Sequence, residues 1–190
     1  MKNFLEFIKD TPTAFHASFK FKEKLKKEGF IELKENEAWK ISLGGKYFIG
    51  RNMSSLLVFV LPKVMPKGFH ITAAHLDSPT FKLKPNFTLD KGRYVKLNTE
   101  VYGGPIYSTW MDRPLGIAGR VLVLEDHTIK AKLVNIDEPV VCIPNLPIHY
   151  NRNVNKGVEL NPQVDMLPLF AETKGNKVSL YQKIAEVLKV

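Results

Sequence analysis

The segment from Phe69 to Asp77 constrains the fold of this chain more than any other. Its centre, Ile71-Thr72-Ala73-Ala74, is continuously apolar rather than alternating, which is typical of a strand covered on both faces. Such strands belong to α/β proteins, in which helices pack on both sides of a sheet. The apolar run ends abruptly at His75-Leu76-Asp77. We therefore expect an α/β domain with polar groups at the carboxyl end of a strand, where active sites usually lie.

The residues before this segment also predict a mixed α/β arrangement. Thr11-Pro12-Thr13 is a helix start, with a capping hydroxyl and a proline in the first turn. Gly29 is a suitable C-cap for that helix. The buried stripe of the helix is expected to contain Ala14, Ser18, Phe21 and Leu25. Short strands are predicted at Tyr47–Ile49 and Leu56–Leu61, joined by a turn at Asn52–Ser55.

After Lys84 the sequence becomes rich in β-forming residues. Strands are predicted at Tyr94–Val101, Ile117–Leu124 and Thr128–Ile136, with turns at Gly103–Pro105 and Glu125–His127. An irregular stretch follows, marked by Pro139, Pro144, Pro147, Pro162 and Pro168.

The last segment is predicted to be a helix. Ser179 and Gln182 form a capping box, and the apolar stripe consists of Leu180, Ile184, Val187 and Leu188. We therefore divide the chain into an α/β part (1–84), a β-rich part (85–170) and a helix (171–190) that returns to the α/β part.

His75-x-Asp77 is the motif that carries chemistry. Residues i and i+2 of a strand point to the same side, so the imidazole and the carboxylate would share one face. A histidine that binds zinc commonly uses a carboxylate to fix its tautomer and orientation. His75 as the metal ligand and Asp77 as the orienting group satisfy this chemistry. Taken alone, the triplet favours a hydrogen-bonded histidine near a strand end over a metal ligand, because such triplets occur by chance in many proteins.

Composition narrows the class of protein. The net charge is +9, but the lysines are scattered, and the densest cluster, Lys20–Lys27, falls on the polar side of a predicted helix. This pattern indicates a solvated face rather than a nucleic-acid partner. The chain has no apolar run of the roughly 20 residues that a membrane helix needs. Its single cysteine, Cys142, fits a reducing compartment and a cytoplasmic location.

Several blocks of the sequence closely resemble the aspartyl aminopeptidase/aminopeptidase I family of zinc metallopeptidases, in the order found in that family. The central block is Thr72–Pro85, which is similar to the first metal-site motif of the family. The other blocks are Thr11–Ala17, Tyr47–Ser55, Tyr102–Gly104, Ser108–Leu115, Ala118–Val121, Ile143–His149, Asn151–Asn155, Leu160–Gln163 and Leu167–Leu169. The resemblance covers the N-terminal part of the family only.

The resemblance implies a zinc-peptidase α/β sandwich interrupted by a β-rich dimerisation domain, here 85–170. It implies that His75 binds one of two zinc ions, that the catalytic-site carboxylate Asp77 orients it, and that His149 reaches the substrate site of a partner subunit. For His149 a locally hydrogen-bonded loop histidine is the alternative. The implied reaction removes an N-terminal residue, often acidic, from a peptide substrate, in a homodimer or larger homo-oligomer.

The resemblance also implies an incomplete site. In the family the bridging aspartate, the glutamate pair, a further aspartate and a late histidine lie beyond the point that matches Val190. We therefore expect this chain alone to be inactive. The alternatives are a non-catalytic dimerisation or assembly fragment and, less favoured, a nucleic-acid binder. Asp112 and Arg113 are interpreted as a turn ion pair, and His16, His70 and His127 are assigned no role.

Overall fold

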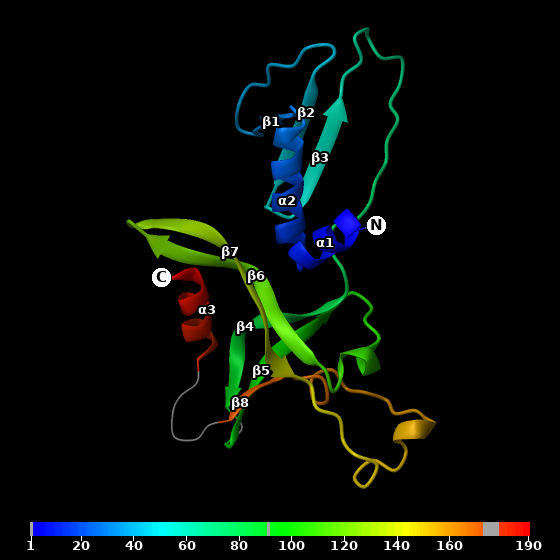
Figure 1. Cartoon of the computed structure of the whole chain (residues 1–190), viewed down its shortest axis with the longest axis vertical. Coiled ribbons are helices and arrows are strands. Elements are labelled where there is room, and N and C mark those ends of the chain that lie inside the picture. Colours follow the sequence, from blue (N-terminus) through cyan, green and yellow to red (C-terminus); the bar gives the residue numbers. More distant parts are fainter. Residues whose placement is uncertain (1, 91, 173–178) are drawn as a thin grey trace. The chain divides into compact units, whose positions relative to one another are not determined.

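The chain folds into two units, residues 1–78 and 79–190. The computed structural model describes residues 2–90, 92–172 and 179–190. Figure 1 shows helices α1 and α2 with strands β1–β3 in the first unit, and strands β4–β8 with helix α3 in the second. The fold class is therefore mixed α/β with two sheets and few helices.

The first unit is a small sheet with a helix packed against it. It contains α1 (Lys2–Asp10), α2 (Ala14–Lys27), β1 (Ile31–Leu33), β2 (Lys46–Arg51) and β3 (Ser55–Val60). The sheet order is β1-β2-β3, with β1 parallel and β3 antiparallel to β2. Leu33, Tyr47 and Ile49 form its buried core. The predicted β2–β3 turn is confirmed, because Asn52 and Met53 both adopt positive φ.

The prediction for α2 is confirmed at its C-terminus but only in part at its N-terminus, where Pro12 precedes the N-cap and does not lie in the first turn. Thr13 is the N-cap, and its side-chain oxygen accepts a hydrogen bond from the His16 amide at 3.4 Å. At the other end Gly29 has φ +80° and follows the C-cap residue Glu28. The amides of Gly29 and Phe30 donate to the carbonyls of Lys26 and Leu25. This is the Schellman arrangement, which satisfies carbonyls that would otherwise lack a partner.

The predicted strand Phe69–Asp77 is wrong. Residues 61–79 contain no helix or strand, and Phe69 and Ile71 are each 86% exposed. A strand needs a hydrogen-bonding neighbour, and one that is apolar on both faces also needs a layer on each side. The described residues of the first unit supply neither a neighbouring strand nor two covering layers to this segment, because their sheet contains only β1, β2 and β3.

The second unit is built on a five-stranded antiparallel sheet of order β4-β5-β8-β7-β6. Its strands are β4 (Thr80–Asp90), β5 (Tyr94–Tyr102), β6 (Pro114–Glu125), β7 (Thr128–Cys142) and β8 (Leu169–Glu172). Two short 3₁₀ helices, η1 (Tyr107–Trp110) and η2 (Val154–Lys156), lie in the connections. The predicted turn at Glu125–His127 is confirmed by the positive φ of Asp126 and His127.

Two of these strands were not predicted. In β4, Phe81, Leu83, Phe87 and Leu89 do alternate with polar residues, but Pro85 and Asn86 interrupt the pattern, and the pairing with β5 shifts between Leu83 and Thr88. The expected domain boundary at 84 thus falls inside β4. The strand β8 has only four residues, too few for a periodic signal.

Pro139 lies within β7 and not in an irregular stretch as predicted. Residues 137–140 fall between the paired positions Ile136 and Val141, where the register with β6 shifts between Leu115 and Ile117. A proline is tolerated at such an irregularity because no ladder hydrogen bond is lost there.

Helix α3 (Leu180–Leu188) is formed as predicted and packs within the second unit. Leu180 is buried with Leu97 and Val141, and Ile184 packs against them. The predicted capping box is wrong in its chemistry, because Ser179 occupies the N-cap position but its side chain makes no capping hydrogen bond.

We predict that Gly29→Ala lowers the free energy of unfolding by about 1 kcal/mol, because a residue with a Cβ is strained at positive φ. Nothing lies within 4 Å of a Cβ added at Gly29, so the loss would come from the backbone alone. Urea unfolding measures it, with Gly68→Ala as the matched control, since that site is equally open and its φ is not positive. Equal losses in both variants would contradict the explanation.

Candidate functional site

The structure brings the side chains of His75 and Asp77 together, although they lie in the connection between β3 and β4 and not on a strand. The Nδ1 atom of His75 is 3.0 Å from Oδ1 of Asp77 and 2.7 Å from the Asp77 carbonyl oxygen. The connection is fixed at its far end, where Thr80 pairs with Tyr102. Pro79 lies so close to Gly103 (φ +74°) that a Cβ there would meet its Cα at 3.3 Å.

The two contacts of Nδ1 define the tautomer of His75. A carbonyl and a carboxylate oxygen can only accept hydrogen bonds, so Nδ1 must carry the proton. In the neutral imidazole the other nitrogen, Nε2, then has the free electron pair. A metal-binding histidine is oriented in this way, with one nitrogen donating to a carboxylate or carbonyl and the other on the metal.

The pair is exposed, and it is not part of a larger cluster. The side chain of His75 is 83% exposed and that of Asp77 is 39% exposed. In the parts of the chain that the structure describes, no three His, Cys, Asp or Glu side chains gather in a group that could hold a metal ion. The pair can therefore supply one oriented imidazole nitrogen, whereas catalytic zinc sites typically use three protein ligands.

The other singled-out residues lie elsewhere. His149 is exposed in a turn of the loop that follows β7. Asp112 accepts a hydrogen bond from the Asn145 amide at 2.9 Å, and Arg113 donates to the Thr109 carbonyl at 3.2 Å. The predicted ion pair between Asp112 and Arg113 is wrong: both side chains are described, and each bonds to the backbone of a neighbouring loop.

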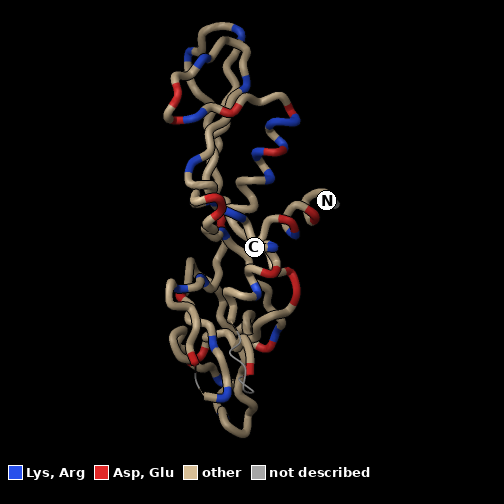
Figure 2. The backbone as a smooth tube through the Cα atoms, turned by 90° about the vertical axis from the view of Figure 1, so that its left-hand side faces the viewer, with Lys and Arg blue, Asp and Glu red and all other residues tan. Residues whose placement is uncertain are grey.

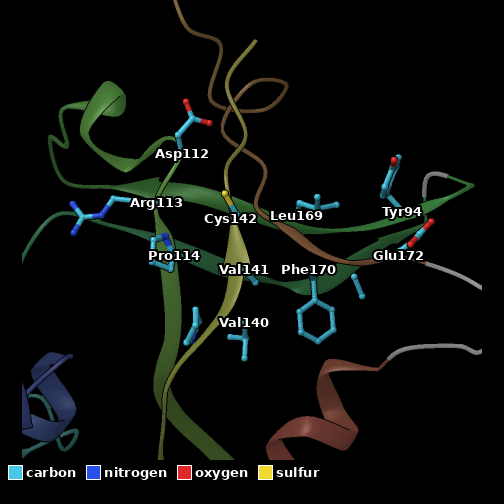
Figure 3. Close-up of a pocket in the computed structure, with 12 residues that line it drawn as sticks. Tyr94, Asp112, Arg113, Pro114, Val140, Val141, Cys142, Leu169, Phe170 and Glu172 are labelled. Atoms are coloured by element: carbon cyan, nitrogen blue, oxygen red, sulfur yellow. The ribbon is translucent and has the colours of Figure 1, made fainter. Parts of the chain in front are cut away.

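A shallow depression of about 500 Å³ in the second unit does not form a reaction site. Figure 3 shows it lined by residues of β5, β6, β7 and β8, with Arg113 and Glu172 at opposite ends. Cys142 lies between them, and Val140, Val141 and Phe170 make much of the lining apolar. The charged groups do not converge on a common point.

The distribution of charge does not mark a binding face either. Figure 2 shows basic and acidic positions interspersed along both units. On α2 the lysines alternate with other residues, and two of them, Lys22 and Lys26, are paired with Glu32 at 2.9 and 2.7 Å. Among the described helices, none is both long enough and apolar enough to pass through a lipid bilayer.

The fold is mixed α/β, and a carboxylate two residues away orients a histidine. These two features are compatible with a metal-dependent hydrolase. The sequence pattern described as "Aminopeptidase I zinc metalloprotease (M18)" matches residues 7–187. The chain belongs to this family.

Individual relatives agree with that assignment. The chain is 53% identical over 170 residues to a probable M18 family aminopeptidase 2 of Clostridium novyi, an alignment that covers 87% of this chain and 39% of the relative. It is 39% identical over 189 residues to a probable aspartyl aminopeptidase of Ricinus communis, covering 96% and 38%. The chain therefore spans about two fifths of the length of these relatives.

Solved structures show the same similarity in three dimensions. The mApe1 structure of Chaetomium thermophilum matches with a TM-score of 0.87 and 31% identity, over 100% of this chain and 46% of that one. The mApe1 dodecamer of S. cerevisiae matches with a TM-score of 0.81 and 30% identity, over 100% and 44%.

We predict that the neutral His75 imidazole carries its proton on Nδ1, and that Asp77→Ala shifts it toward the Nε2-protonated form. Long-range ¹H–¹⁵N correlation spectra at neutral pH distinguish the two tautomers. His127, another exposed histidine, should be unaffected by the substitution and is the internal control. An unchanged His75 spectrum in Asp77→Ala would show that the carboxylate does not set the tautomer.

His16 should make the first unit less stable in mild acid. Burial lowers the pKa of its imidazole below the ordinary value of 6.5. The unfolded chain therefore takes up a proton before the folded chain does, and the free energy of unfolding falls as the pH drops below about 6.5.

Urea unfolding at about pH 7.5 and 5.5 tests this expectation. The decline should be smaller in His16→Gln than in the unsubstituted chain. The variant His127→Gln should retain the full decline, and an equal decline in all three proteins would contradict the assignment to His16.

Proposed function

We propose that this chain contributes the first metal-ligand motif of a zinc aminopeptidase that removes N-terminal, often acidic, residues from peptides. In this proposal, 1–84 is part of a peptidase α/β domain, 85–170 is a dimerisation domain inserted into it, and 171–190 leads back to the peptidase domain. The protein would act in the cytoplasm as a homodimer or a larger homo-oligomer.

One observation carries the proposal, namely the contact between His75 and Asp77. The carboxylate and the carbonyl of Asp77 hold Nδ1 at 3.0 and 2.7 Å, so the histidine would present Nε2 to a metal without first having to reorganise its ring. The chemistry of this pair fits zinc, since a neutral imidazole nitrogen is one of its common ligands. When bound, zinc polarises the scissile carbonyl and activates water.

His75 and Asp77 would have separate tasks. His75 would donate the electron pair of Nε2 to one zinc ion. Asp77 would act as a positioning residue, because its carboxylate touches the ring of His75 and fixes the tautomer. The negative charge of the carboxylate also raises the basicity of the ligand.

The proposed role of His149 is contact with the substrate bound to a partner subunit. Its exposure in the loop after β7 is compatible with that role, because the side chain is available to a second chain.

The chain by itself is proposed to be inactive. No metal-binding cluster of three suitable side chains is present in its described parts, and a hydrolase also needs a general base for the attacking water. A single imidazole would hold zinc only weakly.

A second candidate function is a non-catalytic assembly fragment. It is favoured by the exposed apolar face of the hairpin formed by β6 and β7, where Leu122, Leu124 and Ile129 are 68%, 73% and 72% exposed. Under that reading the chain would associate without metal.

Zinc content and peptidase assays on the purified chain test the proposal. We expect well under one zinc per chain, and no turnover of a peptide with an N-terminal aspartate. Any residual zinc binding should be lost in His75→Ala and kept in the control His127→Ala. Turnover that a chelator abolishes, or about two zinc ions per chain as in two-metal hydrolases, would contradict an incomplete site.

A further inference from the structure

The connection that follows β3 carries two adjacent apolar side chains at the end of the first unit. Residues 61–68 form a loop without helix or strand, and Figure 1 shows the chain passing beyond the ends of β2 and β3 before it turns back. In this loop Val64 and Met65 are 72% and 80% exposed. Neither belongs to the buried core of the unit, so packing within the unit does not explain their position.

The loop is held at its base. The Leu61 amide donates to the Gly45 carbonyl at 2.9 Å. The Gly44 amide donates to the Pro62 carbonyl, also at 2.9 Å. Pro62 and Pro66 lie on either side of the two apolar residues and restrict the backbone there, because the proline ring fixes φ. The loop is therefore a preformed protrusion, and little entropy is lost when a partner covers its tip.

Positive charge flanks the same tip. Lys63 lies directly before the apolar pair and Lys67 lies two residues after it, and both side chains are exposed. Neither lysine has a carboxylate partner among the residues that the structure describes. Residues 38–76 contain no aspartate or glutamate, whereas Lys40 and Lys46 add to their positive charge. Charge alone marks no binding face on this chain, but here unpaired ammonium groups adjoin exposed apolar side chains.

This combination favours a lipid surface over other partners. Lysine is depleted in protein–protein interfaces relative to the rest of a protein surface. A nucleic acid would bind the lysines through its phosphates but would leave the apolar pair uncovered. A bilayer with anionic lipids attracts lysine and accepts short apolar insertions at the level of its headgroups. The alkyl stem of lysine can lie along such apolar groups while its ammonium group stays in water.

We propose that the loop 61–68 is a membrane-contact loop, which binds the surface of a bilayer that contains anionic lipids. Val64 and Met65 enter the headgroup region, and Lys63 and Lys67 contact the lipid phosphates. The inference goes beyond the proposed function and requires neither zinc nor peptidase activity. It is compatible with action in the cytoplasm, because the cytoplasmic leaflet carries anionic lipids. A single loop gives reversible binding, since stable anchoring takes more than one signal.

Vesicle flotation of the full chain tests the proposal. With vesicles of equal parts phosphatidylcholine and phosphatidylserine, the chain should float at about 0.1 M salt, where charges act over about 10 Å. It should be released at about 1 M salt, where that range falls to about 3 Å. Vesicles of phosphatidylcholine alone should bind little of it, because they lack the negative surface charge.

The lysines are tested by Lys63→Gln/Lys67→Gln. This variant should lower the partition coefficient about 30-fold, since each lysine near an anionic surface contributes about fivefold. The matched control is Arg152→Gln/Lys156→Gln, which removes two exposed positive charges from the second unit and should bind nearly as well as the unsubstituted chain. Circular dichroism confirms that each variant is folded.

The apolar pair is tested without a change of charge. Val64→Ser/Met65→Ser should lower the partition coefficient about tenfold or more, because the apolar surface that enters the headgroup region is lost. The matched control is Leu122→Ser/Leu124→Ser in the second unit, where the two side chains are 68% and 73% exposed. This control should keep its binding.

The methyl group of Met65 reports the position of the loop directly. Lipids with a nitroxide on the acyl chain should broaden its signal in a chain labelled with carbon-13 at the methionine methyl groups. Met53 lies in the turn at the opposite end of β2 and β3. Its signal should remain sharp, and it is the internal control.

Four results would overturn the membrane contact. They are no flotation with the mixed vesicles, equal losses in the lysine variant and its control, equal broadening of Met65 and Met53, and a serine variant that binds normally. The last result would mean that charge alone attracts the chain, which would suit a nucleic acid equally well. None of these measurements involves zinc or a peptide substrate, so their failure is distinguishable from a failure of the proposed function.

Discussion

The second unit depends on one short strand that joins two larger β-structures. β4 and β5 form one antiparallel pair, and β6 and β7 form another. β8, with four residues, lies between them. Leu169 pairs with Lys96 on one side and with Cys142 on the other, and the Leu97 amide donates to the Pro168 carbonyl at 2.8 Å.

Leu180 of α3 is then buried with Leu97 and Val141, so one helix side chain contacts both halves of the sheet. The continuous apolar core of this unit exists because β8 closes the gap.

This arrangement explains which parts of the fold could be predicted from the sequence. Elements with local signals were predicted correctly. They include the Gly29 terminus of α2, the β2–β3 turn and the hairpin turn at Asp126–His127, whose backbone conformations follow from residues close in sequence. The strand β8 carries no such signal. It is a strand because the edges of β5 and β7 form hydrogen bonds with it. These edges are created by the tertiary fold, so the local sequence of β8 does not predict the strand. The same dependence explains the error at Phe69–Asp77, where the apolar run predicts a strand but the described residues provide no sheet edge for it.

The candidate site was predicted only in part, for a related reason. Spacing along the chain indicated that His75 and Asp77 act together, and their side chains do meet. The prediction attributed this contact to the alternation of side chains along a strand. In the structure the two residues meet in an irregular connection, and the backbone carbonyl of Asp77 is a second acceptor for His75. The tautomer therefore follows from two local contacts and does not require a sheet. Among the described residues no third potential ligand joins the pair in a metal-binding group.

The exposed apolar groups in the two units have different physical consequences. Phe69 and Ile71 lie in a segment without regular structure. A partner that covered them would also have to form hydrogen bonds with the backbone of this segment. Leu122, Leu124 and Ile129 lie on a complete hairpin whose mutual hydrogen bonds are already made. A partner therefore gains apolar contact at the hairpin without having to order the chain first, and the entropy lost on association is correspondingly small. A preformed apolar surface can be covered without further ordering of the chain, whereas the segment around Phe69 would be covered only together with its own folding.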